Sequence, residues 1–487
     1  MTSISAKRGA TRLIGWIGWA GLDAIGRLAL LTGSTVVFSR LLSPRDFGVT
    51  ALALTIVTVA AVFVGSPFEE ALAQRRHLRM MHLRAALGAS WAVGAALVAL
   101  SIPAGLLLAD AYGAPEMRLL LPVSMASVFF SGHSDIATAL ARRLRRFNDV
   151  AYATLAGHVV GIALALLLAL LGYGLWALIG QRLLVVVARA IILQWRIGFL
   201  ILPGWSSAHV GELGRFAGYS FLARLTESVT YLVFNNLVQI FYGVSTLGLV
   251  NMAMRLIEPI RGAILGTGHN LAFSFFARAN HDAARLSRLA ADVVSQSAFV
   301  TAPVFVGLAA VTPALLPLVA GPGWDEAIGV AICLSLASAM AVPSGLIYTA
   351  FSANGRPEFS LMSLVAGFFA MAAVLVGASA LGPIGVGLSR IAGDAVRAGV
   401  AIGLSPRHLG WSRRGRFDAL SPAWLLAGLM GLVVALAGAA TPALGHAAQA
   451  SMIVGLGVAV YAALLAVFAR PVFDVFAGHV APLLRRR

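Results

Sequence analysis

The sequence predicts an all-α integral membrane protein with about fourteen transmembrane helices. Of its 487 residues, 59% are hydrophobic and 11% are charged, whereas a soluble domain carries about 25% charged residues. Apolar stretches of about 20 residues recur from end to end, and each is long enough to cross roughly 30 Å of hydrocarbon. Because the backbone in lipid must satisfy its own hydrogen bonds, these stretches are helices.

The predicted spans follow one another through short connections, with no large soluble domain inserted between them. In chain order they are residues 12–40, 46–73, 83–110, 116–140, 150–171, 173–195, 215–241, 245–273, 288–312, 325–352, 359–380, 383–404, 420–441 and 447–469. Basic residues justify this series, because they recur before the first span, at every second connection and after the last span. The tail after Arg470, which ends in three arginines, is expected to lie along the membrane surface.

The placement of basic residues also predicts the orientation of the chain. By these spans, 25 of the 36 basic residues lie on one side and three, Arg40, Arg45 and Arg118, on the opposite side. Since cytoplasmic loops carry the excess of Lys and Arg, the arginine-rich side is cytoplasmic. Because the number of spans is even, both termini are expected on this cytoplasmic side. The predicted location is the inner membrane.

Two pairs of similar segments suggest an internal duplication. Phe47-Gly-Val-Thr-Ala-Leu-Ala53 resembles Leu247-Gly-Leu-Val-Asn-Met-Ala253, and Leu171-Gly-Tyr-Gly-Leu-Trp-Ala-Leu178 resembles Leu381-Gly-Pro-Ile-Gly-Val-Gly-Leu388. We therefore predict two parallel six-helix lobes around a central cavity, as in transporters that work by alternating access. The lobes are assigned to residues 1–200 and 201–412, with an extra helix pair and a basic tail in residues 413–487.

Several segments resemble a known family when they are taken together. They are Arg40-Leu-Leu-Ser-Pro-Arg-Asp-Phe-Gly48, Gly172-Tyr-Gly-Leu-Trp-Ala-Leu178, Arg215-Phe-Ala-Gly-Tyr-Ser220, Leu247-Gly-Leu-Val-Asn-Met-Ala253, Ala320-Gly-Pro-Gly-Trp324 and Asn354-Gly-Arg-Pro357. In combination they resemble the Wzx-type oligosaccharide flippases of the polysaccharide transporter family. That family belongs to the multidrug/oligosaccharidyl-lipid/polysaccharide exporter superfamily. The segment Pro67-Phe-Glu-Glu70 departs from the more apolar sequence that relatives often have there.

The resemblance implies a transporter and not an enzyme, with no catalytic residue. It implies movement of an undecaprenyl-pyrophosphate-linked oligosaccharide repeat unit from the inner to the outer leaflet, for exopolysaccharide or O-antigen synthesis. Besides this substrate and membrane lipid, a polysaccharide polymerase and glycosyltransferases are expected partners. The alternatives are a multidrug or cation antiporter of the same superfamily, and a membrane polysaccharide polymerase or ligase. The antiporter would favour acidic residues, and the polymerase would need a long external loop.

Charged residues inside the spans are the candidate functional residues. Each is costly at the centre of a bilayer, roughly 2.5–3.5 kcal/mol on insertion scales, and so normally faces a cavity or a partner. Excluding Glu69 and Glu70, which lie near the end of the second span, eight arginines accompany five acids. The arginines are Arg27, Arg182, Arg189, Arg224, Arg255, Arg261, Arg390 and Arg397, and the acids are Asp23, Asp135, Glu227, Glu258 and Asp394.

An excess of guanidinium groups suits a pyrophosphate, which arginine binds in a bidentate manner. The candidate substrate-binding residues are Arg224, Arg255, Arg261, Glu227, Glu258, Asn235, Asn236, Asn251, Asp23 and Arg27. The asparagines suit sugar hydroxyls, and interhelical hydrogen bonding is the alternative role for them. For the acids, the alternative is pairing with an arginine three or four residues away on the same helix.

Other functional classes find no support in the sequence. His133 and Asp135 do not share a helix face, the single cysteine excludes a cysteine metal cluster, and no nucleotide-binding or nucleic-acid motif is present. No metal, cofactor or nucleic acid is therefore expected.

Overall fold

The computed structural model describes residues 22–23, 25–65, 68, 72, 78–279, 282–356, 358–441 and 445–470. Within these residues every regular element is a helix, so the predicted all-α class is confirmed. Three predicted features lie outside the described residues: the first part of the span 12–40, most of the segment Pro67-Phe-Glu-Glu70, and the tail after Arg470. The chain divides into two compact units, Met1–Gly248 and Leu249–Arg487.

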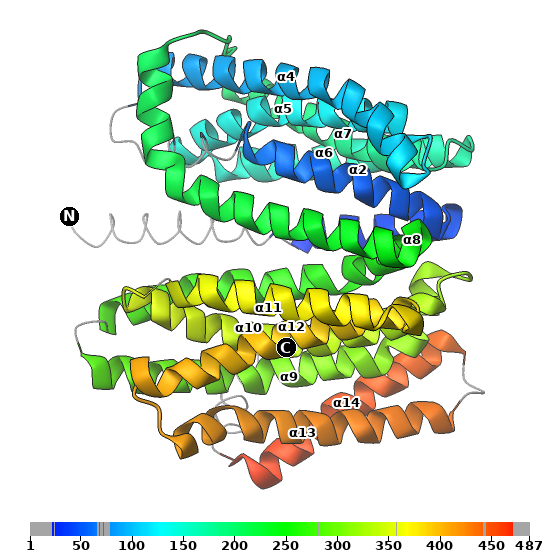
Figure 1. Ribbon diagram of the computed structural model, residues 1–487, viewed down its shortest axis with the longest axis vertical. Coiled ribbons are helices and arrows are strands. Elements are labelled where there is room, and N and C mark those ends of the chain that lie inside the picture. Colours follow the sequence, from blue (N-terminus) through cyan, green and yellow to red (C-terminus); the bar gives the residue numbers. More distant parts are fainter. Residues whose placement is uncertain are drawn as a thin grey trace, which may run out of the picture. The chain divides into compact units, whose positions relative to one another are not determined.

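The first unit is a bundle of long helices (Figure 1). After a helical segment at residues 25–41 come α2 (Pro44–Val62), α4 (Met80–Tyr112), α5 (Met117–Arg143), α6 (Phe147–Leu170) and α7 (Trp176–Ile197). The helix α6 packs along α7, and α4 packs along α5. One core cluster of this unit joins Leu87 of α4, Ile136 of α5 and Leu193 of α7. Each of these helices lies at a span predicted from the sequence, but α2 ends at Val62, whereas the predicted span runs to residue 73.

The helix α8 (Ser207–Ala279) consists of two helices that meet at Gly243. Its 73 residues would measure about 110 Å as one straight helix, at 1.5 Å per residue, which is several times the thickness of the hydrocarbon. Gly243 has φ of 83°, a conformation that glycine adopts without a steric penalty. The interruption falls between the predicted spans 215–241 and 245–273, so α8 contains two separate helices where two spans were predicted.

The second unit contains, after the end of α8, the remaining helices of the chain. These are α9 (Ala283–Ala320), α10 (Glu326–Ala353), α11 (Glu358–Gly377), the short 3₁₀ helix η1 (Ser379–Leu381), α12 (Pro383–His408), α13 (Arg413–Ala440) and α14 (His446–Phe468). The helix α10 lies between α9 and α12, and α11 packs on α12. The extra pair α13 and α14 packs on α9, where Tyr461 donates a 2.8 Å hydrogen bond to the carbonyl of Phe299.

The family-like segment at residues 40–48 builds the start of α2. Ser43 is the N-cap and Asp46 completes a capping box, because the backbone N–H of Ser43 donates to the Asp46 carboxylate at 3.0 Å. Pro44 occupies the first turn, where its missing N–H costs nothing. Arg45 pairs with Glu116 at 2.8 Å, before α5. This segment therefore fixes where α2 begins.

The repeated glycines Gly48 and Gly248 lie where α2 meets the chain after Gly243. A Cβ atom on Gly48 would lie 2.0 Å from the carbonyl oxygen of Val244, and one on Gly248 would lie 1.8 Å from that of Pro44. Neither distance is possible for a real side chain. The two glycines thus permit a backbone-to-backbone approach, as small residues do where membrane helices cross.

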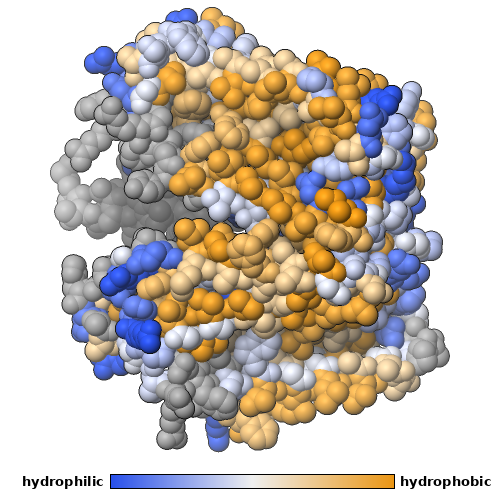
Figure 2. Space-filling model, in the orientation of Figure 1, coloured by the Kyte–Doolittle hydropathy of each residue, from blue (hydrophilic) through white to orange (hydrophobic). Residues whose placement is uncertain are grey.

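Hydrophobic side chains gather along the middle of the helices and hydrophilic ones at their ends (Figure 2). In the described part of the chain, eleven helices are long and apolar enough to cross a membrane. The helix α12 is not among them, because every stretch of 18 residues in it contains at least three charged residues. These features make the chain a multi-pass membrane protein.

Candidate functional site

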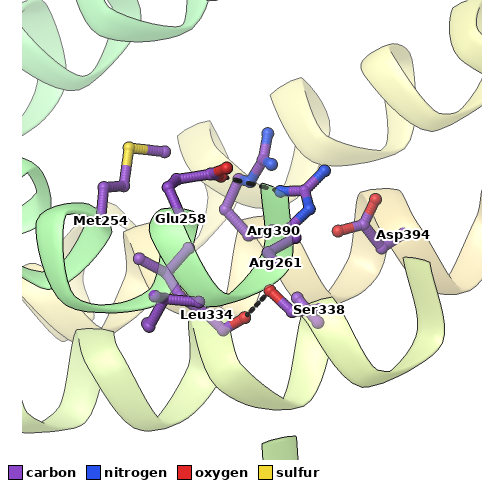
Figure 3. A pocket seen from close by; sticks show the side chains of 9 residues that line it. Met254, Glu258, Arg261, Leu334, Ser338, Arg390 and Asp394 are labelled. Atoms are coloured by element: carbon purple, nitrogen blue, oxygen red, sulfur yellow. Dashed lines mark hydrogen bonds and ion pairs between the residues drawn. The ribbon is translucent and has the colours of Figure 1, made fainter. Parts of the chain in front are cut away.

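A small pocket in the second unit brings charged side chains of two membrane helices together (Figure 3). The helix α8 contributes Met254, Ile257, Glu258 and Arg261, α10 contributes Leu334, Ala337 and Ser338, and α12 contributes Arg390 and Asp394. The space between these side chains has room for about one water molecule. The pocket is therefore nearly closed, and its polar groups lie close to one another.

Glycines allow the helices around this pocket to pack tightly. A Cβ atom on Gly387 of α12 would lie 2.6 Å from Cβ of Cys333, so α10 and α12 approach closely there. A Cβ atom on Gly367 of α11 would lie 2.4 Å from Cγ of Arg397. Because Gly367 has no side chain, the aliphatic part of Arg397 can pack against α11 at this position.

The charges of this cluster are paired along each helix. Arg261 and Glu258 form an ion pair of 2.9 Å in α8, and Arg397 and Asp394 form a weaker one of 3.7 Å in α12. The guanidinium of Arg390 also lies 3.9 Å from the sulfur of Met371. Three guanidinium groups and two carboxylates leave one net positive charge in the cluster.

This cluster retains unused hydrogen-bond donors. In the described structure, the buried Nε atoms of Arg261 and Arg397 have no hydrogen-bond partner. An unsatisfied buried donor costs about 1–3 kcal/mol. The charges that line the pocket itself balance, and Arg397 beside it gives the cluster its net positive charge. A net positive cluster with spare N–H donors is suited to an anion, because charge-assisted bonds from guanidinium to phosphate are strong.

The structure places four of the predicted residues, all in the second unit, on one stretch of α8. Glu258 and Arg261 line the pocket, while Asn251 and Arg255 lie one or two turns earlier and are partly buried. For Glu258, the sequence suggested pairing with Arg255, three residues before it. The ion pair of Glu258 described above joins it to Arg261, three residues after it.

The predicted residues of the first unit do not form one site. Asp23 and Arg27 form the intrahelical pair suggested by their spacing, at 3.2 Å. His158 of α6 lies within electrostatic range of both residues and of Arg189, which donates a 2.7 Å hydrogen bond to the hydroxyl of Thr138. Arg224 and Glu227 are exposed on the first arm of α8.

Asn235 and Asn236 take part in contacts between helices. Asn235 is fully buried and donates a 2.6 Å hydrogen bond to Thr55 of α2. Asn236 accepts a hydrogen bond from the hydroxyl of Tyr112 in α4 and donates to the carbonyl of Leu232 at 2.8 Å. This geometry fits the interhelical role that the sequence left open for both side chains.

Three residues of this cluster are not among the substrate-binding candidates predicted from the sequence. Arg390, Asp394 and Arg397 of α12 were recognised from the sequence as charges within a span but were not ranked. Two signals pointed to them: the high charge of their helix, and spacings of three, four and seven residues that place all three on one face of α12. What the sequence lacked was the packing of α8, α10 and α12 around one pocket.

The chemistry available to this cluster is recognition of a charged group. No group of three or more metal-ligating side chains occurs among the described residues. Two carboxylates and three guanidinium groups, held by intrahelical pairs, provide positive charge and directional N–H donors. The arrangement is suited to holding an anionic group within the membrane.

Comparison with known proteins adds the following. The sequence profile of a family described as "Polysaccharide biosynthesis protein" matches residues 37–329, more than half of the chain. The succinoglycan biosynthesis transport protein ExoT of Rhizobium meliloti (strain 1021) is 26% identical over 338 residues. That match covers 67% of this chain and 66% of the length of ExoT, so it spans slightly less than two thirds of the relative.

Two solved structures have a similar fold. The lipid II flippase MurJ, in an inward closed conformation, has a TM-score of 0.74 at 15% identity over 94% of this chain and 99% of that one. An inward-facing multidrug resistance MATE family transporter of the MOP superfamily has a TM-score of 0.60 at 18% identity, over 79% and 94% respectively. At these identities the likeness establishes the fold.

Proposed function

The chain belongs to the polysaccharide biosynthesis protein family, as its sequence suggested, and on that premise we propose that it is a flippase for a lipid-linked oligosaccharide. The proposed substrate is an oligosaccharide repeat unit on undecaprenyl pyrophosphate. It moves from the inner to the outer leaflet of the bacterial cytoplasmic membrane by alternating access, for exopolysaccharide or O-antigen synthesis. A polymerase and glycosyltransferases are its proposed partners in that synthesis.

The observation that carries the proposal is the arginine-rich cluster inside the membrane-spanning helices of a chain from this family. The ExoT relative is named as a transport protein of succinoglycan biosynthesis, and the MurJ neighbour as a lipid II flippase. A lipid-linked precursor carries its negative charge at the pyrophosphate. The cluster of Arg261, Arg390 and Arg397 supports such a ligand because its cations outnumber its carboxylates.

We assign the pyrophosphate to guanidinium groups of α8 and α12. Arg255 and Arg261 are substrate-binding candidates predicted from the sequence, and Arg390 and Arg397 are added from the structure. Arg224 remains a candidate on the exposed face of the first arm of α8. Glu258 and Asp394 keep these arginines in place through their ion pairs, and the anionic head group competes for the same N–H donors.

A cation antiporter is the second candidate, because a multidrug resistance MATE transporter has the same fold. Its cationic substrates favour a cavity in which carboxylates outnumber arginines. In the cluster on α8 and α12 the balance is the opposite. The flippase is therefore the function that this geometry supports better.

Deletion of the gene is the first test. We expect loss of a surface polysaccharide and accumulation of lipid-linked repeat units on the inner leaflet, measured by chemical labelling of intact and opened cells. Normal polymer export in a strain without a paralogue would refute the proposal.

Paired substitutions test the role of the arginines. If Arg261 contacts the substrate, Arg261→Ala removes transport at a normal protein level, and adding Glu258→Ala does not restore it. If Arg261 only neutralises Glu258, the double variant regains transport, because no charge is left unpaired within the membrane helix. Arg261→Lys should restore transport only partly, since an ammonium keeps the charge but loses the planar fork. The same loss is expected of Arg255→Ala.

A further inference from the structure

A second cavity lies in the first unit, at the end where α5 and α7 finish and α6 begins. It has a volume of about 570 Å³ and is lined by Arg146, Asn148, Asp149, Trp195 and Arg196. Arg146 lies in the turn between α5 and α6, Asn148 and Asp149 lie in the first turn of α6, and Trp195 and Arg196 lie in the last turn of α7. They are separate from the cluster on α8 and α12, and the proposed flippase activity does not use them.

A buried carboxylate holds two arginines at this cavity. Asp149 is only 3% exposed. It accepts hydrogen bonds from Nε of Arg146 at 2.5 Å and from Nε of Arg196 at 2.9 Å, and it forms an ion pair of 2.7 Å with Nη2 of Arg196. Nη2 of Arg146 also donates to the carbonyl of Arg196 at 2.7 Å. Both guanidinium groups are therefore fixed in position before any ligand arrives.

The charge and donors of this triad suit a phosphodiester. Two guanidinium groups and one carboxylate leave a net charge of +1, which equals in magnitude the single negative charge of a phosphodiester. Each guanidinium has five N–H donors, and the bonds to Asp149 and to the carbonyl use only part of them. About a third of each arginine side chain is exposed, so donors remain accessible from the cavity.

Aromatic and apolar side chains surround the same end of the unit. Trp195 is 76% exposed beside the triad, and the ring of Tyr152 lies 5.0 Å below the guanidinium carbon of Arg196. The segment after α7 adds the exposed residues Phe199, Leu200, Leu202 and Trp205. Tryptophan and tyrosine gather where a membrane meets water, at the level of the lipid head groups. The side chains around the arginines are therefore typical of the level at which lipid phosphates lie.

We propose that this cavity binds the head group of an anionic phospholipid from the surrounding leaflet. The phosphate lies between Arg146 and Arg196, and the glycerol and acyl chains follow the exposed face of Trp195. A pyrophosphate on a lipid carrier has at least one more negative charge than the triad can neutralise. That difference favours a bilayer phospholipid over the transported substrate at this site.

Lipid binding by the purified full-length protein in detergent tests the proposal. The probes are phosphatidylglycerol and phosphatidylcholine with identical acyl chains, and retained lipids are counted by native mass spectrometry. Asn148→Asp places a carboxylate in the cavity without removing a partner of Asp149. Arg142→Gln is the matched control, because it changes the net charge equally in the nearby last turn of α5 but outside the cavity lining.

We expect the wild type to retain phosphatidylglycerol in preference to phosphatidylcholine. Asn148→Asp should weaken this retention about tenfold, while Arg142→Gln should leave it nearly unchanged, because only the first opposes the phosphate directly. Arg196→Lys should weaken the retention of phosphatidylglycerol to an intermediate degree, since lysine keeps the charge but lacks the planar guanidinium group. An unchanged melting temperature of each lipid-free variant would show that it folds.

Three results would overturn the proposal. Equal retention of the two lipids by the wild type would remove the preference for an anion. Equal weakening by Asn148→Asp and Arg142→Gln would reduce the effect to diffuse surface charge. The third result is that undecaprenyl pyrophosphate displaces phosphatidylglycerol from the wild type but not from Asn148→Asp. This result would assign the cavity to the transported substrate.

Discussion

At the scale of the residue, the family-like segment at residues 40–48 acts mainly through local geometry. Its serine and aspartate cap α2, its proline opens the first turn, and Gly48 allows the chain after Gly243 to approach. The sequence identified this segment as a family feature but did not give the reason for each residue type. Capping could be predicted from Ser43 and Asp46, whereas the close approach required the three-dimensional contact.

Replacing Gly248 by alanine should destabilise the protein. Its new Cβ would lie 1.8 Å from the carbonyl oxygen of Pro44, so the backbones must separate. Overpacking of this kind costs about 1–3 kcal/mol, and we expect a lower melting temperature in detergent. Gly428→Ala is the control, because nothing lies within 4 Å of that Cβ. A melting temperature for Gly248→Ala equal to that of the control would contradict the contact.

The ion pair between Arg45 and Glu116 should make stability depend on pH in the acid range. Partial burial opposes ionisation of Glu116, but hydrogen bonds from Arg45 outweigh it and lower the pKa of this carboxyl below its ordinary value. A carboxyl with a lowered folded-state pKa stabilises the protein above its unfolded-state pKa and loses that contribution as the pH falls. We expect the melting temperature to decrease below about pH 4, a range set by the ordinary glutamate pKa.

Glu116→Gln is the matched variant for this pH effect. It cannot ionise, so its melting temperature at neutral pH should be slightly lower and its acid dependence weaker than those of the wild type. The effect is expected to be small, because exposed ion pairs contribute little. Identical pH profiles for the two proteins would show that the pair contributes nothing to stability.

At the scale of the element, α12 combines a length sufficient for a membrane crossing with a high charge. Its charges are tolerated because Asp394 is 5% exposed and pairs with Arg397, while Arg390 lines the pocket with α8 and α10. The sequence predicted a span at 383–404, and the structure has a helix over these residues, but this helix carries too much charge to count among the eleven apolar candidate spans. These charges were not ranked as site residues, because the ranking rested on the adjacent predicted spans 215–241 and 245–273. Nothing in the sequence indicated which helices pack together.

The contact between α11 and α12 can be tested at Gly367. A methyl group there would meet the stem of Arg397, so Gly367→Ala should displace that guanidinium and weaken its pair with Asp394. We expect reduced transport of lipid-linked repeat units at a normal protein level. The control is Gly399→Ala in α12, where nothing lies within 4 Å of the new Cβ. Equal transport by both variants would mean that the position of Arg397 does not matter.

At the scale of the whole molecule, the sequence predicted the all-α class, the spans and the break inside α8. The length of each apolar stretch and the need of its backbone to form its own hydrogen bonds in lipid determine these features. They can therefore be derived from single segments. The pocket on α8, α10 and α12 could not be derived in this way, since it depends on packing between segments up to about 140 residues apart. The roles of Asn235 and Asn236 depend on the same kind of contact.

The orientation of the chain remains a prediction, based on the unequal distribution of basic residues between alternate loops. A reporter fused after Arg414 should behave as cytoplasmic, and one fused near Gly321 as periplasmic. Enzyme reporters that are active on only one side of the membrane measure this directly. Opposite results at both positions would reverse the topology.

The interruption at Gly243 has a consequence for biosynthesis. During insertion, a nascent chain that failed to break within α8 would cross the bilayer one time fewer, and every later segment would emerge on the wrong side. The arginine-rich loops between Arg285 and Arg407 would then lie outside the cytoplasm, on the side that the positive-inside rule disfavours. A single glycine therefore helps to determine on which side of the membrane every later loop lies. We expect its replacement to show first as misinsertion and degradation of the nascent protein.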